Sequence, residues 1–466
     1  MLFSSITFLY YFLPCVLVVY FAVPKALKNV WLFVVSLFFY AWGEPKCVFL
    51  MLATLVLNYT FGILIEKTSK KTLKKTYLTI SVVGTLSALL YFKYAGFFVK
   101  NFSAITGLAV PALKIALPIG ISFYTFQILS YTVDVYRGEV KAQRNPLDLG
   151  TYLALFPQLI AGPIVRYKDV AEELSHRAHS FEKVAQGIRR FILGLGKKVL
   201  IANTLGELCE SFYATNDASV MFYWLFAVVY MLQIYFDFSG YSDMAIGLGR
   251  ILGFKFLENF NYPFISKSIT EFWRRWHMSL GSWFRDYVYF PLGGSRVKRP
   301  RLILNLFVVW FLTGFWHGAE WNFVLWGLFF FVFLTLEKLF FKDLLKKSNA
   351  VGHIYTLFLV TVSFMIFSGN NATEAISRVG GLFGAGGIPF ASAEAIYQFK
   401  NYGVLILVAI LGATPLPKNI YYYLKNKRAF CQALDILEIP ALLLILVVVT
   451  AFLADGSFNP FLYFRF

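Results

Sequence analysis

Long apolar segments recur along the whole chain, and short basic loops separate them. The clearest segments span residues 6–23, 48–65, 77–92, 220–238, 355–367, 404–413 and 441–453. A helix needs roughly 20 largely apolar residues to cross a bilayer. Only 15% of the 466 residues are charged, whereas soluble domains average about 25%. These features predict an all-α polytopic membrane protein with about ten or eleven transmembrane helices.

Some of the apolar segments are shorter than a full span or contain Gly or Pro. Such segments predict re-entrant or broken helices, which are tolerated only where protein or a water-filled cavity shields the backbone. No polar stretch is long enough to bury a core of its own. We therefore expect a single integral membrane domain over residues 1–466 rather than several domains. Its informative motifs lie in about residues 117–330.

The formal net charge of +18 results from basic side chains that are clustered in short loops. These loops cover residues 67–75, 166–190, 267–301, 338–347 and 418–428. Basic short loops beside membrane spans mark the cytoplasmic side. The charges therefore indicate topology and contact with membrane lipid, and we expect no nucleic-acid partner. The four cysteines are scattered without Cys-x-x-Cys spacing, which indicates neither a disulfide framework nor a zinc site.

Two segments combine Pro and Gly where a plain lipid-facing helix would have neither. They are 117–127 (LPIGISFYTFQ), which ends in Gln127, and 156–166 (FPQLIAGPIVR). Pro and Gly together break a helix. Each break is either a kink or connecting turn, or a re-entrant loop that lines a cavity.

A third segment, 233–243 (QIYFDFSGYSD), places Asp237 and Asp243 six residues apart at the end of an apolar run. A calcium or magnesium site needs more oxygen ligands than these two carboxylates supply, and we expect no bound metal. Two interpretations remain: a polar network that fixes a broken helix, or side chains that face a substrate.

A fourth segment, 272–294, carries the sequence FWRRWHMSL followed by WFRD and FPLGG. Tryptophan with arginine is typical of an amphipathic helix at the level of the lipid head groups. That interpretation explains the Trp and Arg residues better than it explains His277. This histidine is either a satisfied interfacial residue or part of a functional site.

His317 lies in the segment TGFWHGAEW (313–321), between the apolar runs 303–312 and 323–336. An ionisable side chain inside apolar sequence is costly, which makes it a functional candidate. We expect the small residues on both sides of His317 to leave room for a bound group. A buried imidazole is neutral, because desolvation lowers its pKa, and it could take a proton from an alcohol that attacks an ester or thioester. The alternative is a purely structural histidine.

The three remaining histidines, His176, His179 and His353, lie in or beside charged loops, where we expect them to be solvated. No Gly-x-Ser-x-Gly elbow or Ser-His-Asp order stands out, and Walker or Rossmann glycine spacing is missing. The two Trp-His pairs, at 276–277 and 316–317, are therefore the most specific feature of the chain.

With these segments together, the chain resembles the membrane-bound O-acyltransferases, and among them the bacterial branch that acetylates exported polysaccharides such as alginate. The segments that carry the resemblance are 117–127, 156–166, 235–243, 272–294, 313–326 and the tail 458–464 (FNPFLYF). The resemblance implies the family fold: a ring of helices around a thin, re-entrant centre, with a channel between the two faces of the membrane.

The resemblance also implies roles for individual residues. In that family the histidine of the Trp-His-Gly segment is the catalytic one, which here is His317. The histidine of the Trp-His-Met segment, here His277, supports activity from the cytoplasmic side of the channel. Further candidate substrate or channel residues are Asn305, Asp237, Arg275, Arg285, Asp286 and Gln127.

The activity that the resemblance implies is transfer of an acetyl group across the bacterial plasma (inner) membrane by a multi-pass enzyme. The expected donor is acetyl-CoA, as a substrate rather than a bound cofactor, and the expected acceptor is an exported polysaccharide, alginate-like or peptidoglycan. Because no domain able to grip a polymer is evident, we expect an extracytoplasmic acetyltransferase partner of the serine-hydrolase type. The alternatives are a D-alanyl transferase of teichoic acid synthesis and a glycan transporter or flippase.

Overall fold

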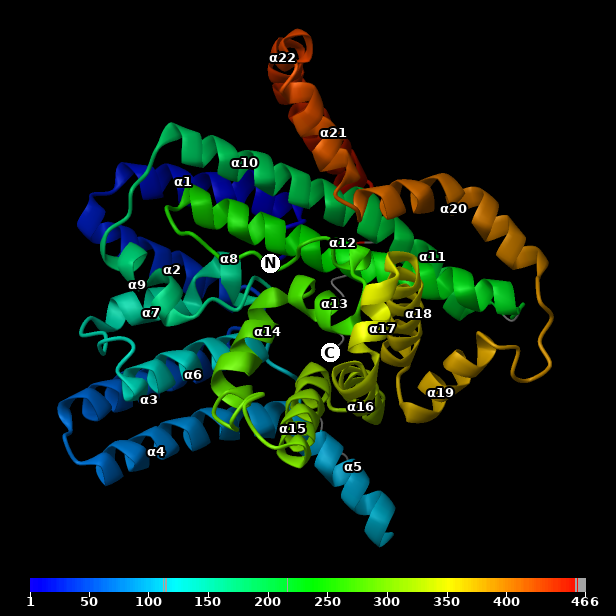
Figure 1. Cartoon of the computed structure of the whole chain (residues 1–466). Helices are drawn as coiled ribbons and strands as arrows, with labels where there is room; N and C mark the ends of the chain where they lie inside the picture. The colour runs from blue at the N-terminus through cyan, green and yellow to red at the C-terminus, as the bar shows by residue number, and fades with distance from the viewer. Residues whose placement is uncertain (112, 114, 216, 457–458, 460–466) are drawn as a thin grey trace. The chain divides into compact units, whose positions relative to one another are not determined.

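The computed structural model describes residues 1–111, 113, 115–215, 217–456 and 459. Within these residues the regular structure is helical, without a β-strand (Figure 1). The chain groups into two compact units, of which the first comprises Met1–Phe191 and Met244–Leu257 and the second Ile192–Asp243 and Glu258–Phe466. The expectation that all 466 residues form a single acyltransferase domain stays a prediction.

The first unit contains the helices of the N-terminal part of the chain. These are α1 (Leu13–Ala22), α2 (Lys28–Ala41), α3 (Cys47–Lys67), α4 (Lys71–Leu89), α5 (Ala95–Thr106), α6 (Ile121–Arg137), α7 (Pro146–Ala154), α8 (Phe156–Leu159), α9 (Tyr167–Ser175) and most of α10 (Phe181–Gly196). Wider π-helical turns extend two of them, η1 (Thr7–Phe12) before α1 and η3 (Leu90–Tyr94) after α4. A short 3₁₀ turn, η2 (Lys25–Leu27), precedes α2.

A buried asparagine joins α3, α4 and α6. The Asn58 amide on α3 donates to Thr85 Oγ1 at 2.8 Å, and its oxygen accepts from Ser81 Oγ and from Thr132 Oγ1, both at 2.7 Å. Asn58 itself has no exposed surface. Because lipid tails drive no hydrophobic association between helices, such interhelical hydrogen bonds and close packing hold membrane helices together.

The second unit contains the remaining helices. These are α11 (Thr204–Ala214), most of α12 (Val220–Ile251), α13 (Ile269–Arg275), α14 (Met278–Phe284), α15 (Arg299–His317), α16 (Trp321–Leu336), α17 (Lys342–Lys347), α18 (Asn349–Ser368), α19 (Ala372–Gly381), α20 (Ala393–Gly412), α21 (Leu416–Lys425) and α22 (Arg428–Ala454). The π-helical turns η4 (Lys197–Asn203), η6 (Arg285–Tyr289) and η7 (Glu337–Phe341) and the 3₁₀ turn η5 (Pro263–Ile265) complete it. Short polar side chains begin several helices, as where Ser348 and Ser392 accept the backbone N–H groups of Val351 and Ala395.

The helices α15 and α16 form the most closely packed hairpin of the second unit. A Cβ added to Gly314 would lie 2.4 Å from the backbone oxygen of Phe323, and one added to Gly327 would lie 2.4 Å from that of Trp310. Real Cβ atoms do not approach so closely, so only glycine fits at either position. The contact sets the place of α15, which ends at His317.

Seven helical stretches among the described residues are long and apolar enough to cross a membrane. They are Cys47–Lys67, Lys71–Thr106, Val220–Ile251, Trp321–Phe341, Asn349–Ser368, Ala393–Gly412 and Ala429–Ala454, and Thr7–Ala22 is a shorter apolar helix. The prediction of an all-α polytopic fold is confirmed. The expected ten or eleven spans exceed this number, because α2 and α6 are short and α15 begins with two arginines.

The two Pro/Gly segments meet each other in the first unit. Gly120 has a φ of 74°, which is a left-handed conformation that suits glycine. A Cβ at this position would lie 2.7 Å from the backbone oxygen of Leu159. Beyond α8, residues 160–165 are buried without regular structure. The second segment is therefore a loop shielded by protein, which is the condition for irregular backbone at membrane depth.

The third segment is not a broken helix, contrary to one of our two interpretations. The helix α12 runs without interruption from Val220 to Ile251. Gly240 is a packing position within it, since a Cβ there would lie 2.8 Å from the backbone oxygen of Gly194. Of the C-terminal tail, only Asn459 is described, and it accepts a hydrogen bond from Asn203 at 3.1 Å. The rest of the predicted tail motif 458–464 lies outside the described residues.

Replacing Gly314 by alanine should force α15 away from α16. Overpacking of this kind costs about 1–3 kcal/mol, so the Tm of the detergent-solubilised Gly314→Ala protein should fall by several degrees. The matched control is Gly403→Ala in α20, where nothing lies within 4 Å of the added Cβ. Alanine favours a helix at such a position, so the control should keep or slightly raise the Tm. Equal Tm values for Gly314→Ala and the unaltered protein would contradict the close contact.

Candidate active site

His317 is the last residue of α15 and is 8% exposed. Its ring lies among aromatic side chains, with ring centroids 4.9 Å from Trp326, 5.5 Å from Phe367 and 5.0 Å from Trp316, each edge to face. Such packing holds the imidazole in one orientation. Trp316 also lies 6.2 Å from the ring of His277. The fold therefore brings the two predicted histidines together around one tryptophan.

The glycines beside His317 leave no space for a ligand, so our sequence interpretation of them is wrong. A Cβ on Gly318 would lie 2.2 Å from the ring of Phe323, and Gly314 is closed by the backbone of the same residue. Both positions are filled by α16. The glycines allow two helices to approach closely, and in this way they position His317 instead of exposing it.

His277 precedes α14 in a left-handed backbone conformation, with a φ of 45°. Its side chain is 1% exposed, and Nδ1 lies 3.1 Å from Oδ1 of Asn259. The same oxygen accepts from Ser279 Oγ at 2.9 Å and from the Ser279 backbone N–H at 3.3 Å. The Asn259 amide in turn donates to Ser242 Oγ on α12 at 3.0 Å. Our sequence interpretation missed Asn259, because a single Asn in an irregular segment carries no local signal.

Asn259 determines which nitrogen of His277 carries the proton. A backbone N–H can only donate, so the Asn259 atom that faces the Ser279 N–H must be the amide oxygen. His277 Nδ1 must then be the donor of its own bond, which leaves the lone pair on Nε2. His277 lies outside the seven candidate spans, and burial lowers its pKa to about 3. The ring is therefore neutral near pH 7, with Nε2 as its basic atom.

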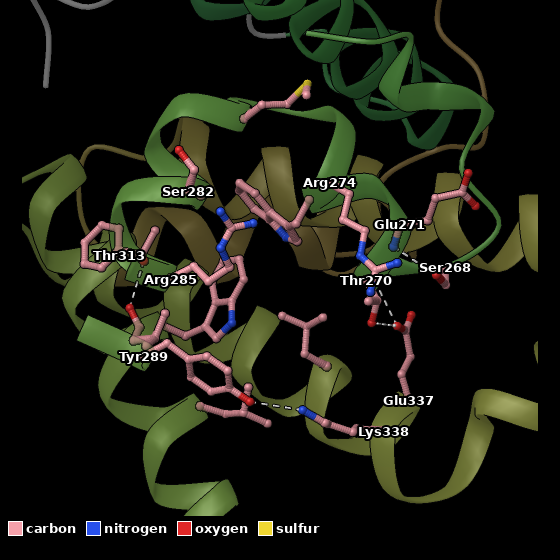
Figure 2. Close-up of a pocket in the computed structure, with 18 of the residues that line it drawn as sticks. Ser268, Thr270, Glu271, Arg274, Ser282, Arg285, Tyr289, Thr313, Glu337 and Lys338 are labelled. Carbon is pink, nitrogen blue, oxygen red and sulfur yellow. Dashed lines mark hydrogen bonds between the residues drawn. The ribbon is translucent and has the colours of Figure 1, made fainter. Parts of the chain in front are cut away.

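A pocket of about 1170 Å³ lies in the second unit (Figure 2). Its wall includes Met278, which follows His277, and Thr313, one helical turn before His317. The charged side chains that line it are Lys267, Glu271, Arg274, Arg285, Glu337, Lys338 and Lys346. The cations all belong to the two basic segments 267–301 and 338–347 of the sequence. Ligand pockets for drug-sized molecules measure about 300–1,000 Å³, so this one is large enough for a long anionic ligand.

A buried carboxylate holds the helix that forms one wall of the pocket. Glu337 is 3% exposed and accepts from the backbone N–H of Ile269 at 2.5 Å. It also accepts from Thr270 N–H and Oγ1 at 2.9 and 2.7 Å (Figure 2). Ser268 accepts the N–H of Glu271 at 3.0 Å. The first backbone donors of α13 are thus satisfied by two side chains. Because α13 carries Arg274 and leads into His277, Glu337 sets the place of both.

The candidates of the arginine segment, Arg275, Arg285 and Asp286, differ in their relation to the pocket. Arg285 lines the pocket and pairs with Asp286 at 2.8 Å. Arg275 does not line it, because its guanidinium group pairs with Glu271 at 2.9 Å and donates to the Asn261 oxygen at 3.1 Å. The neighbouring Arg274 lines the pocket instead, and in Figure 2 its side chain extends toward the same space as that of Arg285.

Two of the three tryptophans of this segment are core residues and the third, Trp273, lines the pocket, which corrects the interfacial interpretation. Trp276 and Trp283 are only 5% and 7% exposed. The segment is also no continuous amphipathic helix, since α13 ends at Arg275 and α14 begins at Met278. In this structure, tryptophan beside arginine marks the boundary between a buried aromatic core and a polar pocket. The same sequence pattern is also typical of an amphipathic helix at the lipid head groups.

The polar candidates Asn305 and Asp237 both have protein partners. The Asn305 amide, buried in α15, donates to the Gly294 oxygen at 3.0 Å and so ties down the glycine turn that precedes the helix. The Asp237 carboxylate on α12 pairs with Lys198 Nζ at 2.5 Å, with both side chains buried. Next to it, Lys197 pairs with Asp243 at 2.7 Å. The polar-network interpretation of Asp237 fits this arrangement, although we had not identified Lys198.

Gln127 belongs to the first unit, on α6. It is fully buried, and neither its amide nitrogen nor its oxygen has a hydrogen-bond partner among the described residues. A buried amide without a partner is costly, and the role of Gln127 as a substrate or channel residue stays a prediction. Within the described part of the chain, no three His, Cys, Asp or Glu side chains are grouped as metal ligands would be.

Comparison with known proteins identifies the family. The model of the membrane-bound O-acyltransferase (MBOAT) family matches residues 140–373, which include both histidines and the pocket. The probable alginate O-acetylase of Azotobacter vinelandii is 39% identical, with all of both chains covered. The chain belongs to the membrane-bound O-acyltransferases. It is thus a multi-pass membrane enzyme that transfers an acyl group to a hydroxyl, and it requires an acyl donor.

Two further relatives of this O-acyltransferase differ in how much of the chain they match. The peptidoglycan O-acetyltransferase of Helicobacter pylori is 31% identical and covers all of this chain and 98% of its own length. The teichoic acid D-alanyltransferase of Bacillus subtilis is also 31% identical, but the match covers only 54% of this chain and 68% of the relative.

Acid should destabilise the acyltransferase through His277. In the unfolded chain a histidine titrates near pH 6.5, whereas His277 titrates near 3 in the fold. The unfolded state therefore binds more protons between these values, and the stability present above pH 6.5 is lost as the pH falls toward 3. At pH 5 the loss is about 2 kcal/mol. The His277→Asn protein, whose Asn tolerates the positive φ, should lose less Tm than the unaltered protein between pH 7.5 and pH 5.

The control for this titration is His176→Asn, because His176 is exposed in the loop after α9. Its Tm should follow that of the unaltered protein at both pH values. If His277→Asn lost as much Tm on acidification as the unaltered protein, burial of the neutral imidazole would not be the source of the acid sensitivity.

Removal of the Glu337 carboxylate should loosen α13. The Glu337→Ala substitution leaves the buried N–H of Ile269 without a partner, at a cost of about 1–3 kcal/mol, and also frees the partly buried N–H of Thr270. The amides of Ile269 and Thr270 should exchange hydrogen faster, and the Tm should fall. Asp343→Asn is the control, since the Asp343 side chain is 89% exposed and its pair with Lys346 contributes little. Unchanged exchange at Ile269 and Thr270 in Glu337→Ala would show that another group caps α13.

Proposed function

We propose that this enzyme is a membrane O-acetyltransferase that takes the acetyl group of acetyl-CoA at the cytoplasmic face of a bacterial inner membrane and delivers it for O-acetylation of an exported polysaccharide. The observation that carries the proposal is the pocket lined by Arg274, Arg285 and Lys338, next to the helices that hold His277 and His317.

The charges of the pocket support a coenzyme A donor. Five cations, Lys267, Arg274, Arg285, Lys338 and Lys346, line it against the two carboxylates Glu271 and Glu337. Of these carboxylates, Glu337 is occupied with the backbone of α13, and Glu271 accepts the guanidinium of Arg275. The remaining positive charge suits the phosphates of coenzyme A. Basic segments beside membrane spans lie on the cytoplasmic side, where this donor is available.

The aromatic side chains between the pocket and His317 support a route for the acyl group from the donor to this histidine. Trp273 lines the pocket and lies 5.5 Å from Trp326, whose ring meets His317 at 4.9 Å. The indole N–H groups of Trp273 and Trp326 are buried without a hydrogen-bond partner among the described residues. Buried donors of this kind are suited to the carbonyl oxygen of a thioester, on which negative charge develops during attack.

The chemistry would be acyl transfer with His317 as general base. An acceptor hydroxyl loses its proton to the imidazole while its oxygen forms a bond to the acetyl carbon, and the carbon–sulfur bond to coenzyme A breaks. The imidazolium then returns the proton to the departing thiolate. His277, held neutral by burial and by Asn259, would be the second base on the donor side. We propose as acceptor the serine of an extracytoplasmic hydrolase-type partner, which passes the acetyl group to a sugar hydroxyl.

Among the relatives, the acetylases support the acetyl group over the alternatives. The alginate and peptidoglycan relatives align over the full length of this chain, whereas the D-alanyltransferase aligns over about half of it. A D-alanyl transferase nevertheless remains the second candidate within the family. A glycan transporter or flippase is disfavoured, because the chain belongs to a family of acyltransferases.

Loss of the imidazole at position 317 should abolish acetylation. Strains that carry His317→Ala should contain less than about a hundredth of the O-acetyl groups of the parent on their exported glycans, given that a general base contributes a factor of about 10² to 10⁴. His176→Ala should leave the acetyl content unchanged at equal protein level in the membrane. Retained acetyl groups in His317→Ala would exclude this histidine as the base.

The donor can be tested separately in membrane vesicles. Labelled acetyl-CoA added on the cytoplasmic side should transfer its label to material outside, and this transfer should fall in the Arg274→Gln and Arg285→Gln proteins through a higher KM. Label that enters only from a carrier-bound D-alanyl donor would replace acetylation by D-alanylation as the function. Export of unmodified glycan that depends on this chain would instead indicate a transporter.

A further inference from the structure

A second cluster of cations lies in the first unit and shares no residue with the proposed donor pocket. It forms at the corner where α1 ends and α2 begins, and the segment between α9 and α10 packs against it. The members are Tyr20 and Phe21 at the end of α1, Lys28 at the start of α2, and Arg177 and His179 before α10.

The ring of Tyr20 is the fixed centre of this cluster. Its hydroxyl donates to the Leu252 backbone oxygen at 2.6 Å. Because a hydroxyl has one proton, the bond of 3.0 Å between the same oxygen and His179 must be donated by His179 Nε2. Tyr20 has no exposed surface. His179 is exposed, as we expected, and its Nε2 also has Tyr20 as a hydrogen-bond partner.

Two cations are held against aromatic rings at this corner. Lys28 Nζ lies 4.4 Å from the centroid of the Tyr20 ring and 5.4 Å from that of Phe21. The guanidinium carbon of Arg177 lies 4.7 Å from the Phe254 ring and 6.0 Å from the Tyr20 ring. Aromatic faces attract cations and remove part of their hydration, so both charges are positioned but not neutralised.

Among the described residues no carboxylate forms an ion pair with these cations, and the charge of Asp148 acts on Arg177 only from a longer distance. None of the ion pairs among the described residues includes Lys25, Lys28, Arg177 or Lys183. One guanidinium nitrogen of Arg177 donates to Asn29 Oδ1, and the other, Nη1, is buried without a hydrogen-bond partner. The nearby Asp148 is held by the Asn29 amide at 2.6 Å. A buried guanidinium N–H without an acceptor is costly and is suited to an anion.

The positive charges of the corner also repel one another. Burial lowers the pKa of Lys28, and the charges of Arg177 and Lys25 lower it further. Burial likewise lowers the pKa of His179, with added effects from Lys28, Arg177 and Lys183. An anion bound between Lys28 and Arg177 would relieve this repulsion, because each cation would then have an opposite charge nearby.

We propose that this corner binds the phosphate of an anionic phospholipid, with Lys28 and Arg177 as its ligands. The position of the cluster favours a lipid over a soluble anion. It lies at the adjoining ends of the apolar helices α1 and α2, the level at which head groups meet a membrane protein. Phe21, against which Lys28 rests, is 46% exposed, and Val18 one turn earlier is 70% exposed. These apolar side chains would meet the acyl chains of the same lipid.

The test is retention of lipid by the purified full-length protein, measured by native mass spectrometry after incubation with vesicles of phosphatidylglycerol or of phosphatidylcholine. The unaltered protein should retain phosphatidylglycerol preferentially. The Lys28→Gln/Arg177→Gln protein should retain roughly tenfold less of it. The control is Lys141→Gln/Lys400→Gln, which removes two exposed charges outside the basic loops, and it should retain as much as the unaltered protein.

Two further measurements distinguish a bound lipid from a soluble anion and from a variant that does not fold. Inorganic phosphate in millimolar excess should not displace the lipid, and displacement would indicate a soluble anion as the occupant instead. If the double variant does not fold, as judged by its Tm, Lys28→Met keeps the packing of the side-chain stem and removes only its charge. Equal retention of phosphatidylglycerol by Lys28→Met and by the unaltered protein would overturn the proposal. Acyl transfer is not measured in this test, so its result is independent of the proposed enzymatic function.

Discussion

A bilayer interior offers no hydrogen bonds, so every polar group placed there must find its partner within the protein. Much of the architecture described above follows from this constraint. Asn58 joins three helices through hydroxyl groups, and Asn259 joins His277 to α12. The buried Lys198 is neutralised by Asp237. Because these partners come from different helices, the polar side chains also determine which helices pack together, and an apolar sequence acquires one defined arrangement.

The parts of the structure that could be predicted from the sequence depend on local signals. Long apolar segments indicate helices whatever they pack against, and an ionisable residue within such a segment is unusual wherever it occurs. His277 and His317 could be recognised on that ground, and the structure places both beside Trp316. The basic segments 267–301 and 338–347 were recognised as loops with a common location, and their side chains line one pocket.

The parts that could not be predicted depend on neighbours distant in sequence. In the sequence, Glu337 is an ordinary acidic residue at the end of an apolar helix. Its role depends on the start of α13, which is distant in sequence and contacts it only in the fold. The glycines beside His317 were misinterpreted because small residues look the same whether a ligand or another helix fills the space, and here Phe323 fills it. Likewise, Trp276 has a neighbourhood of arginines in sequence but of aromatic rings in space.

The backbone at His277 is a final case in which chemistry and conformation cannot be separated. A φ of 45° costs an L-residue with a Cβ roughly 1–2 kcal/mol, and this strain persists because Asn259 and α14 hold both ends of the turn. An alanine at this position would remove the imidazole and keep the strain, whereas a glycine would remove both. The strained backbone conformation therefore fixes the direction of the side chain. If φ relaxed to a negative value, the ring would move away from Asn259, and the basic nitrogen would lose its fixed direction.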